Sequence, residues 1–334
     1  QAGCDTGEWR IDGECTALDT VLDASWHRID PAGDTRCAHD TDYTFWVRPG
    51  NDDILLYFQG GGGCWDQSSC RIGSSFYKQR VSPLEPRTYR NGIFDFNNPD
   101  NPFADHTIIF APSCTGDVYM GSGVVDYGDD VVVHHRGFDN LMAAVNFTID
   151  YAPEPASVFV TGCSAGSVGS AVAIPHIIDA YPDTRVTQLG DSLGLIFRLP
   201  NDFTSFWGIR DFYTPTLAEF APDYSAFTMT DYYHGLGQAY PDHTFAQFNY
   251  QYDNVQQRYF AIGQADPRQF VGENLPIVLQ DIADSTTNFR YYIEEGDSHC
   301  ILPSADLYRA EVNGVPALDW ITSIALGEPV DNLP

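Results

Sequence analysis

Residues 158–171 read VFVTGCSAGSVGSA, an apolar, β-branched run followed by Gly162, Ser164 and Gly166 and then by further small residues. Gly and Ser are common in ordinary turns, so the G-x-S-x-G pattern alone fits a plain turn. It also fits a nucleophile elbow, the sharp strand-to-helix turn that lifts a serine oxygen above an α/β sheet. The elements on either side of Ser164 decide between the two.

Strand-like and helix-like segments alternate along the chain. Apolar runs predict strands over residues 43–48, 53–59, 106–111, 157–161, 185–189, 245–252 and 288–293. Apolar spacing and small apolar residues predict helices over residues 137–151, 166–181, 306–311 and 317–326. This alternation predicts an α/β fold, a mostly parallel sheet with helices on both faces. The turn at Ser164 then follows a buried strand and precedes a small-residue helix, as an elbow requires.

Length and composition predict a single domain over residues 1–334, with enough hydrophobic residues (43%) for a packed core. Residues 1–40 are polar and are expected to be irregular. Residues 198–244 are rich in aromatic residues, Pro and Asp, and we interpret them as an inserted cap. The chain has no apolar run of about 18 residues and no basic, apolar leader, so we expect no transmembrane helix and a mature or trimmed chain.

The chain is strongly acidic, with 46 acidic and 17 basic residues and a formal net charge of −29. Such a surface repels nucleic acid and anionic membranes, so neither is expected as a partner. Solvation of a secreted protein is the simplest interpretation of the charge, and calcium binding is the alternative.

Eight cysteines, without a C-x-x-C pair or a compact Cys/His cluster of zinc spacing, predict four disulfides rather than a metal site. Disulfides form in oxidising compartments, so we expect a secreted or periplasmic protein. Two pairs are close in sequence and are the simplest to expect: Cys4 with Cys15, which would tie the N-terminal segment, and Cys64 with Cys70.

A serine nucleophile needs a base to accept its proton. In α/β-hydrolases the chain order is Ser, acid, His, so the base should follow Ser164. His176 falls in the helix after the elbow, and His234 and His243 fall in the expected cap. His299 follows the last of the predicted strands, where a catalytic histidine belongs, and is the predicted base.

Three aspartates are candidates for the acid that orients the imidazole. Asp253 ends the strand before the histidine strand, which is the usual position of the acid, and it is preferred. Asp191 ends the strand before that and could instead shape the pocket floor or bind backbone amides. Asp297 is only two residues before His299, so its side chain is expected to point elsewhere.

Four consecutive glycines, Gly60–Gly63, follow the predicted strand over residues 53–59. Glycine lets the backbone approach a ligand closely. A phosphate-binding loop is disfavoured because the GxxxxGK[ST] pattern is absent, and a plain turn is the other alternative. We expect the backbone N–H groups of this loop, with that of Ala165, to stabilise the oxyanion of a tetrahedral intermediate.

Several separate motifs resemble the pectin acetylesterase family, which includes plant and bacterial esterases and the animal Notum carboxylesterases. They are QGGGGCWDQSSC (59–70), APSCTGDVYMGS (111–122), HHRGFDN (134–140), GCSAGS (162–167), YDNVQ (252–256) and DSHC (297–300), in the family's order. The resemblance implies an α/β-hydrolase fold and carboxylic ester hydrolysis without a cofactor. It implies the same three triad residues, Ser164, Asp253 and His299, and an oxyanion hole made by Gly61, Gly62 and Ala165.

The resemblance also suggests cysteine pairs and shows one departure. The pairs it suggests are Cys64–Cys70, Cys37–Cys114 and Cys163–Cys300, the last of which would clamp the serine and histidine loops together. Family members often carry a Trp in the glycine loop, whereas this chain has glycine there and Trp65 just after Cys64. The resemblance therefore does not define the shape of the pocket.

These residues predict a two-step acyl transfer in a monomer, with a short acyl ester on carbohydrate, chiefly acetyl, as the substrate. Acetylated neutral polysaccharide fits the acidic surface better than polygalacturonate does. Trp65 and Tyr119, near the glycine loop, are the candidate pocket residues, together with Asp191. A hydrolase of hydrophobic esters or polyesters is the alternative, in which aromatic residues of the cap would line an apolar cleft. The competing interpretation is that these residues only form the packed core of the cap. They are Phe197, Phe203, Phe206, Trp207 and Phe212. A non-catalytic binding protein on the same fold is a further alternative.

Overall fold

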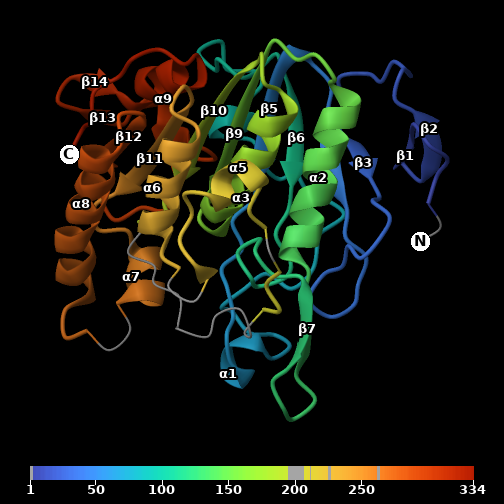
Figure 1. The fold of residues 1–334 in the computed structure, drawn as a ribbon, viewed down its shortest axis with the longest axis horizontal. Coiled ribbons are helices and arrows are strands. Elements are labelled where there is room, and N and C mark those ends of the chain that lie inside the picture. Colours follow the sequence, from blue (N-terminus) through green and yellow to red (C-terminus); the bar gives the residue numbers. More distant parts are fainter. Residues whose placement is uncertain (1–2, 195–206, 211, 225–226, 262–263) are drawn as a thin grey trace.

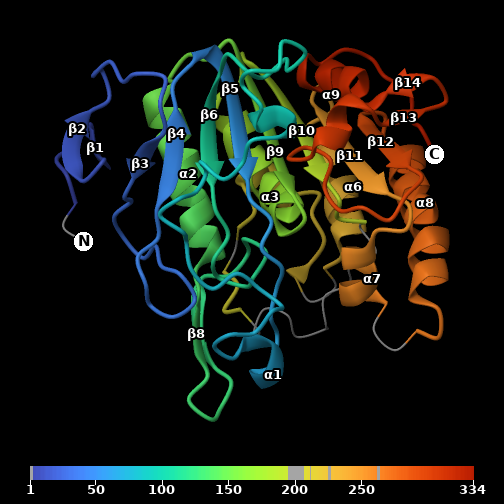
Figure 2. The same cartoon turned by 180° about the vertical axis from the view of Figure 1, so that it is seen from behind.

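A ten-stranded mixed sheet runs through the computed structural model, which describes residues 3–194, 207–210, 212–224, 227–261 and 264–334 (Figures 1 and 2). Six neighbouring strands are parallel, in the order β12 (Phe289–Glu294), β11 (Thr244–Tyr250), β10 (Arg185–Asp191), β9 (Ser157–Cys163), β5 (Asn51–Phe58) and β6 (His106–Ala111). Four antiparallel strands complete the sheet: β4 (Phe45–Arg48), β3 (His27–Ile29), β1 (Glu8–Ile11) and β2 (Glu14–Ala17).

Both faces of the parallel strands are buried, which explains why these strands read as nearly continuous apolar runs. Along β9, Val158 and Val160 enter one core cluster and Phe159 enters the other. β5 alternates in the same way, because successive side chains of a strand point to opposite faces. The α/β class predicted from the sequence is confirmed.

Helices cover the two faces unequally. One face packs against α2 (Gly137–Tyr151), α3 (Ala165–Ala180), α6 (Met229–Ala239) and α8 (Pro267–Ser285). The other face packs against α9 (Ala317–Ala325), η1 (Gly92–Phe94) and η3 (Ala305–Tyr308) (Figure 2). The short helices α1 (Gln67–Cys70) and α7 (Asn254–Phe260) and the hairpin β7–β8 (Gly123–Asp126, Val132–His135) extend toward the lower side of Figure 1, beyond the carboxyl ends of the parallel strands.

The expectation that residues 1–40 are irregular is wrong. They form a hairpin, β1–β2, and the strand β3, which extend the sheet at one edge. The two-residue turn between β1 and β2 is Asp12–Gly13, and both residues have positive φ (51° and 94°). An Asp-Gly pair is a strong hairpin signal, because the turn that matches the strand twist needs positive φ at both positions. The Cys4–Cys15 disulfide ties this hairpin.

The expected cap over residues 198–244 is only partly an insertion. Its second half contains α6, which connects the parallel strands β10 and β11 and places Tyr232, Tyr233 and Leu236 in the core. Also in this region is the short helix α5 (Pro215–Ala218). Trp207 and Phe212 are buried rather than exposed in a cleft, and Phe197, Phe203 and Phe206 lie outside the described residues.

No helix among the described residues combines the length and the apolar character needed to cross a bilayer.

The turn between β9 and α3 packs directly on the end of β5. A Cβ added at Gly166 would overlap the carbonyl oxygen of Phe58, and a Cβ added at Gly162 would overlap the carbonyl oxygens of Gly166 and Phe58. These are backbone atoms at the end of β5 and in the first turn of α3, so they cannot move aside as a flexible side chain could. The two glycines of the G-x-S-x-G motif are therefore required by packing, whatever the serine does.

We predict that Gly166→Ala lowers the free energy of unfolding by at least about 3 kcal/mol, because the new methyl group meets backbone on its buried side. Urea unfolding monitored by tryptophan fluorescence measures the change. Gly3→Ala is the control, since its Cβ would meet no atom closer than Ala32 Cβ at 4.0 Å. Equal stability of the two variants would contradict the packing argument.

Candidate active site

Ser164 lies at the junction of β9 and α3, with a half-buried side chain. Its φ of 57° and ψ of −122° are rare for a residue that is not glycine, and such strain is found mainly at functional sites. Its N–H donates to the Asp191 carbonyl oxygen (2.7 Å), which holds the strained turn in place. The Ser164 hydroxyl makes no capping hydrogen bond to α3, so it is not used to stabilise the start of the helix.

His299 and Asp253 meet through a hydrogen bond of 2.7 Å between Nδ1 and Oδ2. Asp253 is fully buried at the N-cap of α7, and its Oδ1 accepts the N–H groups of Val255 (2.8 Å) and Gln256 (3.0 Å). Oδ2 also accepts from Gln256 Nε2 (3.1 Å). The carboxylate therefore has its acceptor sites filled by donors and can hold the imidazole as the Nδ1–H tautomer, which leaves Nε2 to act as a base.

The Cys163–Cys300 disulfide joins the serine loop to the histidine loop. It links the residue before Ser164 to the residue after His299, with Cα atoms 5.7 Å apart. Two loops that are 137 residues apart in sequence are thus fixed side by side. The structure brings Ser164, Asp253 and His299 to one edge of the sheet, at the carboxyl ends of three parallel strands.

The glycine loop packs against the serine turn. A Cβ added at Gly60 would lie 2.9 Å from the Cys163 carbonyl oxygen and 3.1 Å from Ser164 Cβ. Residues 76–78 pair with the loop, with Lys78 N–H donating to Gly61 O (2.8 Å) and Gly63 N–H donating to Phe76 O (3.2 Å). Because C=O and N–H of a trans peptide point in opposite directions, Gly62 N–H points away from Lys78.

The N–H groups of Gly61 and Gly62 donate to no residue in the described part of the chain. Ala165 is the first residue of α3, where a helix leaves its N–H groups without intrahelical partners. These are the donors expected from the sequence to bind an oxyanion, and the pairing of the loop with residues 76–78 fixes the backbone that carries two of them.

A buried polar network of Gln59, Lys78 and Glu85 lies next to the glycine loop and was not predicted. Lys78 Nζ donates to Gln59 Oε1 (2.6 Å) and to both carboxylate oxygens of Glu85 (2.5 and 2.6 Å). Gln59 Nε2 donates to Glu85 and to the Tyr89 hydroxyl. Burial lowers the pKa of Lys78, and the charge of Glu85 opposes that effect. No local pattern links these residues, so the sequence offered no signal for them.

Tyr119, a predicted pocket residue, is buried beneath the loop instead. Its hydroxyl donates to Gln59 O (2.8 Å) and Ala111 O (3.0 Å), and 2% of the residue is exposed. The side chain therefore supports the backbone before the glycines and has no face toward solvent.

Trp65 remains a candidate pocket residue, because it is half-buried beside the glycine loop. Its ring lies 5.5 Å from Phe76 and 6.4 Å from Tyr259, and Arg258 Cζ lies 4.7 Å from the Phe76 ring centroid. The Tyr259 hydroxyl donates to Phe76 O, and a Cβ at Gly62 would overlap both of these atoms. Phe76, Arg258 and Tyr259 are half-buried or exposed and were missed by the sequence analysis.

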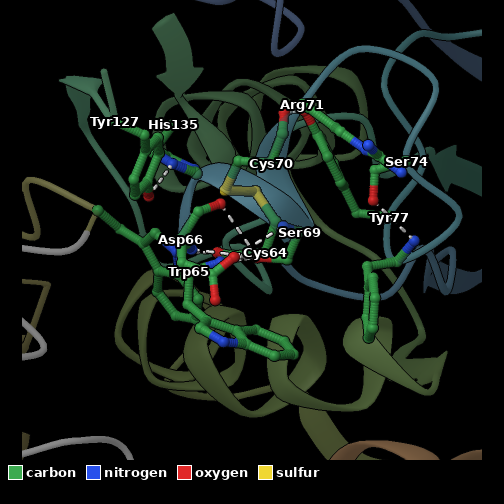
Figure 3. Close-up of a disulfide and its surroundings, with 12 residues drawn as sticks. Cys64, Trp65, Asp66, Ser69, Cys70, Arg71, Ser74, Tyr77, Tyr127 and His135 are labelled. Carbon is green, nitrogen blue, oxygen red and sulfur yellow. Dashed lines mark hydrogen bonds between the residues drawn. A yellow bond between two sulfur atoms is a disulfide. The ribbon is translucent and has the colours of Figure 1, made fainter. Parts of the chain in front are cut away.

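The four predicted disulfides are confirmed, namely Cys4–Cys15, Cys37–Cys114, Cys64–Cys70 and Cys163–Cys300. Cys64–Cys70 closes the loop that carries Trp65, and the Trp65 ring extends away from it (Figure 3). Asp66 caps α1 within the same loop.

His135 approaches the Cys64–Cys70 disulfide but is a structural residue. Its Nδ1 donates to Thr115 O and its Nε2 accepts from the Tyr127 hydroxyl (both 2.8 Å), and burial lowers its pKa to about 3 (Figure 3). Two Cys/His groups among the described residues are close enough to share an ion, one here and one at Cys163, His299 and Cys300. Both contain disulfide sulfurs, which offer no thiolate ligand.

Comparisons with known proteins agree with this architecture. A family model described as pectinacetylesterase matches residues 29–219. "Pectin acetylesterase 4" from Arabidopsis thaliana is 25% identical over 151 residues, which are 42% of this chain, and the chain spans only 36% of the length of that relative.

Two crystal forms of the Wnt deacylase Notum from Drosophila superpose with TM-scores of 0.65 and 0.64. They are 15% and 16% identical, and the superpositions cover 91% of this chain and 94% and 95% of those chains. At this identity the structural matches show the shared α/β-hydrolase fold.

Two buried carboxyl groups near the site, Asp117 and Asp191, make stability depend on pH. Burial raises the pKa of each to about 6 from an ordinary value of 3.8, although hydrogen bonds to both carboxylates act in the opposite direction. The folded state therefore holds protons that the unfolded state has released. The stabilisation is complete below about pH 4 and is lost as the pH rises through about 6.

We predict that the difference in unfolding free energy, wild type minus Asp117→Asn, falls by about 2 kcal/mol between about pH 4 and about pH 7. Urea unfolding at each pH measures this difference, in which the contributions of other titrating groups cancel. The control is the exposed Ser68→Ala, which removes no titratable group, so its difference from wild type should not change with pH. A flat curve for Asp117→Asn would show that this carboxyl group has an ordinary pKa.

Proposed function

From the premise that this chain belongs to the pectinacetylesterase family, we propose that it is a secreted serine carboxylesterase that removes short acyl groups, chiefly acetyl, from carbohydrate. The observation that carries the proposal is the hydrogen bond between His299 and the fully buried Asp253, beside the strained Ser164 turn. A buried carboxylate with this environment is the usual means of orienting a catalytic imidazole. The four disulfides support an extracellular location.

The proposed mechanism has two acyl-transfer steps. Ser164 Oγ attacks the ester carbonyl while His299 Nε2 takes its proton, and Asp253 stabilises the imidazolium that forms. The N–H groups of Gly61, Gly62 and Ala165 bind the oxyanion. His299 then gives its proton to the leaving alkoxide, and a water molecule activated by the same histidine hydrolyses the acyl-enzyme. The dipole of α3, whose N-terminus follows Ser164, favours the developing negative charge.

Two observations bear on the substrate. The net charge of −29 disfavours a polyanionic backbone, so acetylated neutral polysaccharide is the preferred substrate class. Among the aromatic residues proposed to line a cleft for hydrophobic esters, Trp207 and Phe212 are buried in the core. Trp207 Nε1 also donates to Cys64 O (2.8 Å), which gives this ring a structural role. The described residues therefore favour the carbohydrate ester over the polyester.

We predict that Ser164→Ala and Asp253→Asn each lower kcat/KM for p-nitrophenyl acetate by about 10⁴-fold or more, because each removes a part of the proton-transfer machinery. The exposed Ser68→Ala serves as the control and should keep wild-type activity. With wild type, activity should fall from acetate to octanoate. A rise with chain length would favour hydrophobic esters, and activity that survives Ser164→Ala would exclude the proposed nucleophile.

We predict that the double variant Cys163→Ala/Cys300→Ala loses about 10- to 100-fold in kcat while KM changes less than threefold, because a displacement of about 1 Å between nucleophile and base is costly. The matched control is Cys4→Ala/Cys15→Ala, which opens a disulfide in the N-terminal hairpin and should leave kcat unchanged. Circular dichroism checks that both variants fold. Equal kcat for the two variants would show that the Cys163–Cys300 bridge has no part in aligning the loops.

A further inference from the structure

Asp191 contacts both catalytic loops although it belongs to neither. It ends β10, the strand between the serine strand β9 and the acid strand β11. Its backbone carbonyl oxygen accepts the N–H of Ser164 (2.7 Å). Its carboxylate accepts the N–H of Ile301 at Oδ1 (3.1 Å) and that of Leu302 at Oδ2 (2.9 Å). One residue thus holds the nucleophile turn by its main chain and the histidine loop by its side chain.

Ser192 completes the same arrangement. Its hydroxyl donates to Asp191 Oδ1 (3.0 Å) and accepts the N–H of Cys300 (2.9 Å). The amides of Cys300, Ile301 and Leu302, which directly follow His299, are therefore all bound by this pair. Ser192 and Cys300 have φ values of 59° and 63°. Successive N–H groups that include a left-handed residue form a concave anion site, and here the anion is the Asp191 carboxylate.

We propose that Asp191, assisted by Ser192, is a positioning residue that sets the place of His299 relative to Ser164 in the esterase reaction. The inference rests on the proposed function for its kinetic part only. Of the three roles suggested by the sequence, the structure bears out the binding of backbone amides. Asp191 makes no hydrogen bond to the His299 ring, so it is not the acid of the triad, and it is fully buried, so it has no surface for substrate.

The electrostatics agree with this geometry. Burial raises the pKa of Asp191 to about 6, and the bonds from Leu302 and Ile301 and the charge of His299 act against that rise. The other titratable groups that face it are Tyr57 and Tyr250, whose pKa values are raised by burial, so both stay neutral. The carboxylate is therefore ionised at neutral pH, where it also attracts the imidazolium formed during catalysis. Below about pH 6 it takes a proton and cannot accept both amide bonds fully.

The kinetic test compares Asp191→Asn, Asp191→Ala and Ser192→Ala with wild type on p-nitrophenyl acetate. We expect kcat to fall about 100-fold in Asp191→Asn and further in Asp191→Ala, which keeps no acceptor, with KM within threefold of wild type. Ser192→Ala, which removes the bonds to Cys300 and to Asp191 Oδ1 but leaves the carboxylate and its two amide bonds in place, should lose about threefold to tenfold. The loss of kcat below about pH 6 should be steeper in wild type than in Asp191→Asn, which has no carboxyl group to protonate there. A raised KM with unchanged kcat would instead make Asp191 a substrate ligand.

Hydrogen–deuterium exchange provides a test that does not need activity. The amides of Cys300, Ile301 and Leu302 should exchange at least tenfold faster in Asp191→Asn and, for Cys300, in Ser192→Ala. Asp117→Asn is the matched control, because it removes an equally buried carboxylate that binds the N–H groups of Tyr119 and Gly137 instead. Its exchange at residues 300–302 should equal that of wild type.

The outcomes separate the two proposals. If wild type hydrolyses no ester in a Ser164-dependent way but exchange increases as expected, the esterase proposal fails and the anchoring of the loop stands. If wild type is active and Asp191→Asn changes neither kcat nor exchange, the positioning role is overturned. Should Asp191→Asn fail to fold, Ser192→Ala decides, because it leaves the carboxylate in place and predicts a loss limited to kcat and to the Cys300 amide.

Discussion

The close contact between the serine turn and the end of β5 is the constraint on which the rest of the site depends. Gly162 and Gly166 leave no room for side chains, so the turn lies directly on the Phe58 carbonyl. The chain after Phe58 is the glycine loop, and Gly60 in turn touches the backbone and Cβ of the serine turn. Ser164 and the amides of the glycine loop are therefore neighbours because two segments of backbone pack without side chains between them. The strain at Ser164 follows, since the turn must reverse within that space.

Around this contact the protein buries charge, which is costly unless backbone or side-chain donors compensate for it. Asp253 has two amide donors and a glutamine, Asp191 has two amide donors and a hydroxyl, and Lys78 is paired with Glu85. Each group fixes a different segment. Asp253 fixes helix α7, Asp191 fixes the loop that carries His299, and the Lys78–Glu85 pair fixes the glycine loop. The carboxyl edge of the sheet is thus held by charged hydrogen bonds, whereas the two faces are held by apolar packing.

The sequence was informative where one local pattern has one physical meaning. Buried parallel strands gave apolar runs, and the strand over 106–111 and the helix over 137–151 have the predicted bounds. The α8 helix was missed because Pro276 and Gly272 interrupt its pattern, and α6 because Gly235 and Gly237 weaken it, although packing stabilises both. In the site, the order of Ser164, Asp253 and His299 could be read from strand order. The network of Gln59, Lys78 and Glu85 could not, since only folding brings these residues together.

In the proposed reaction the acidic surface would act on a substrate at long range, whereas the residues beside the glycine loop would act on it at contact. Exposed charges are screened beyond a Debye length of about 8 Å at physiological ionic strength, so the net charge of −29 acts mainly on the approach of a polymer. At contact, the rings of Trp65, Phe76 and Tyr259 and the Arg258 guanidinium lie beside the glycine loop. A preference for neutral over acidic polysaccharide should therefore arise in the association rate rather than in the chemical step. Added salt would then reduce that preference through KM and leave kcat unchanged, because Asp253, which binds the His299 ring, is fully buried.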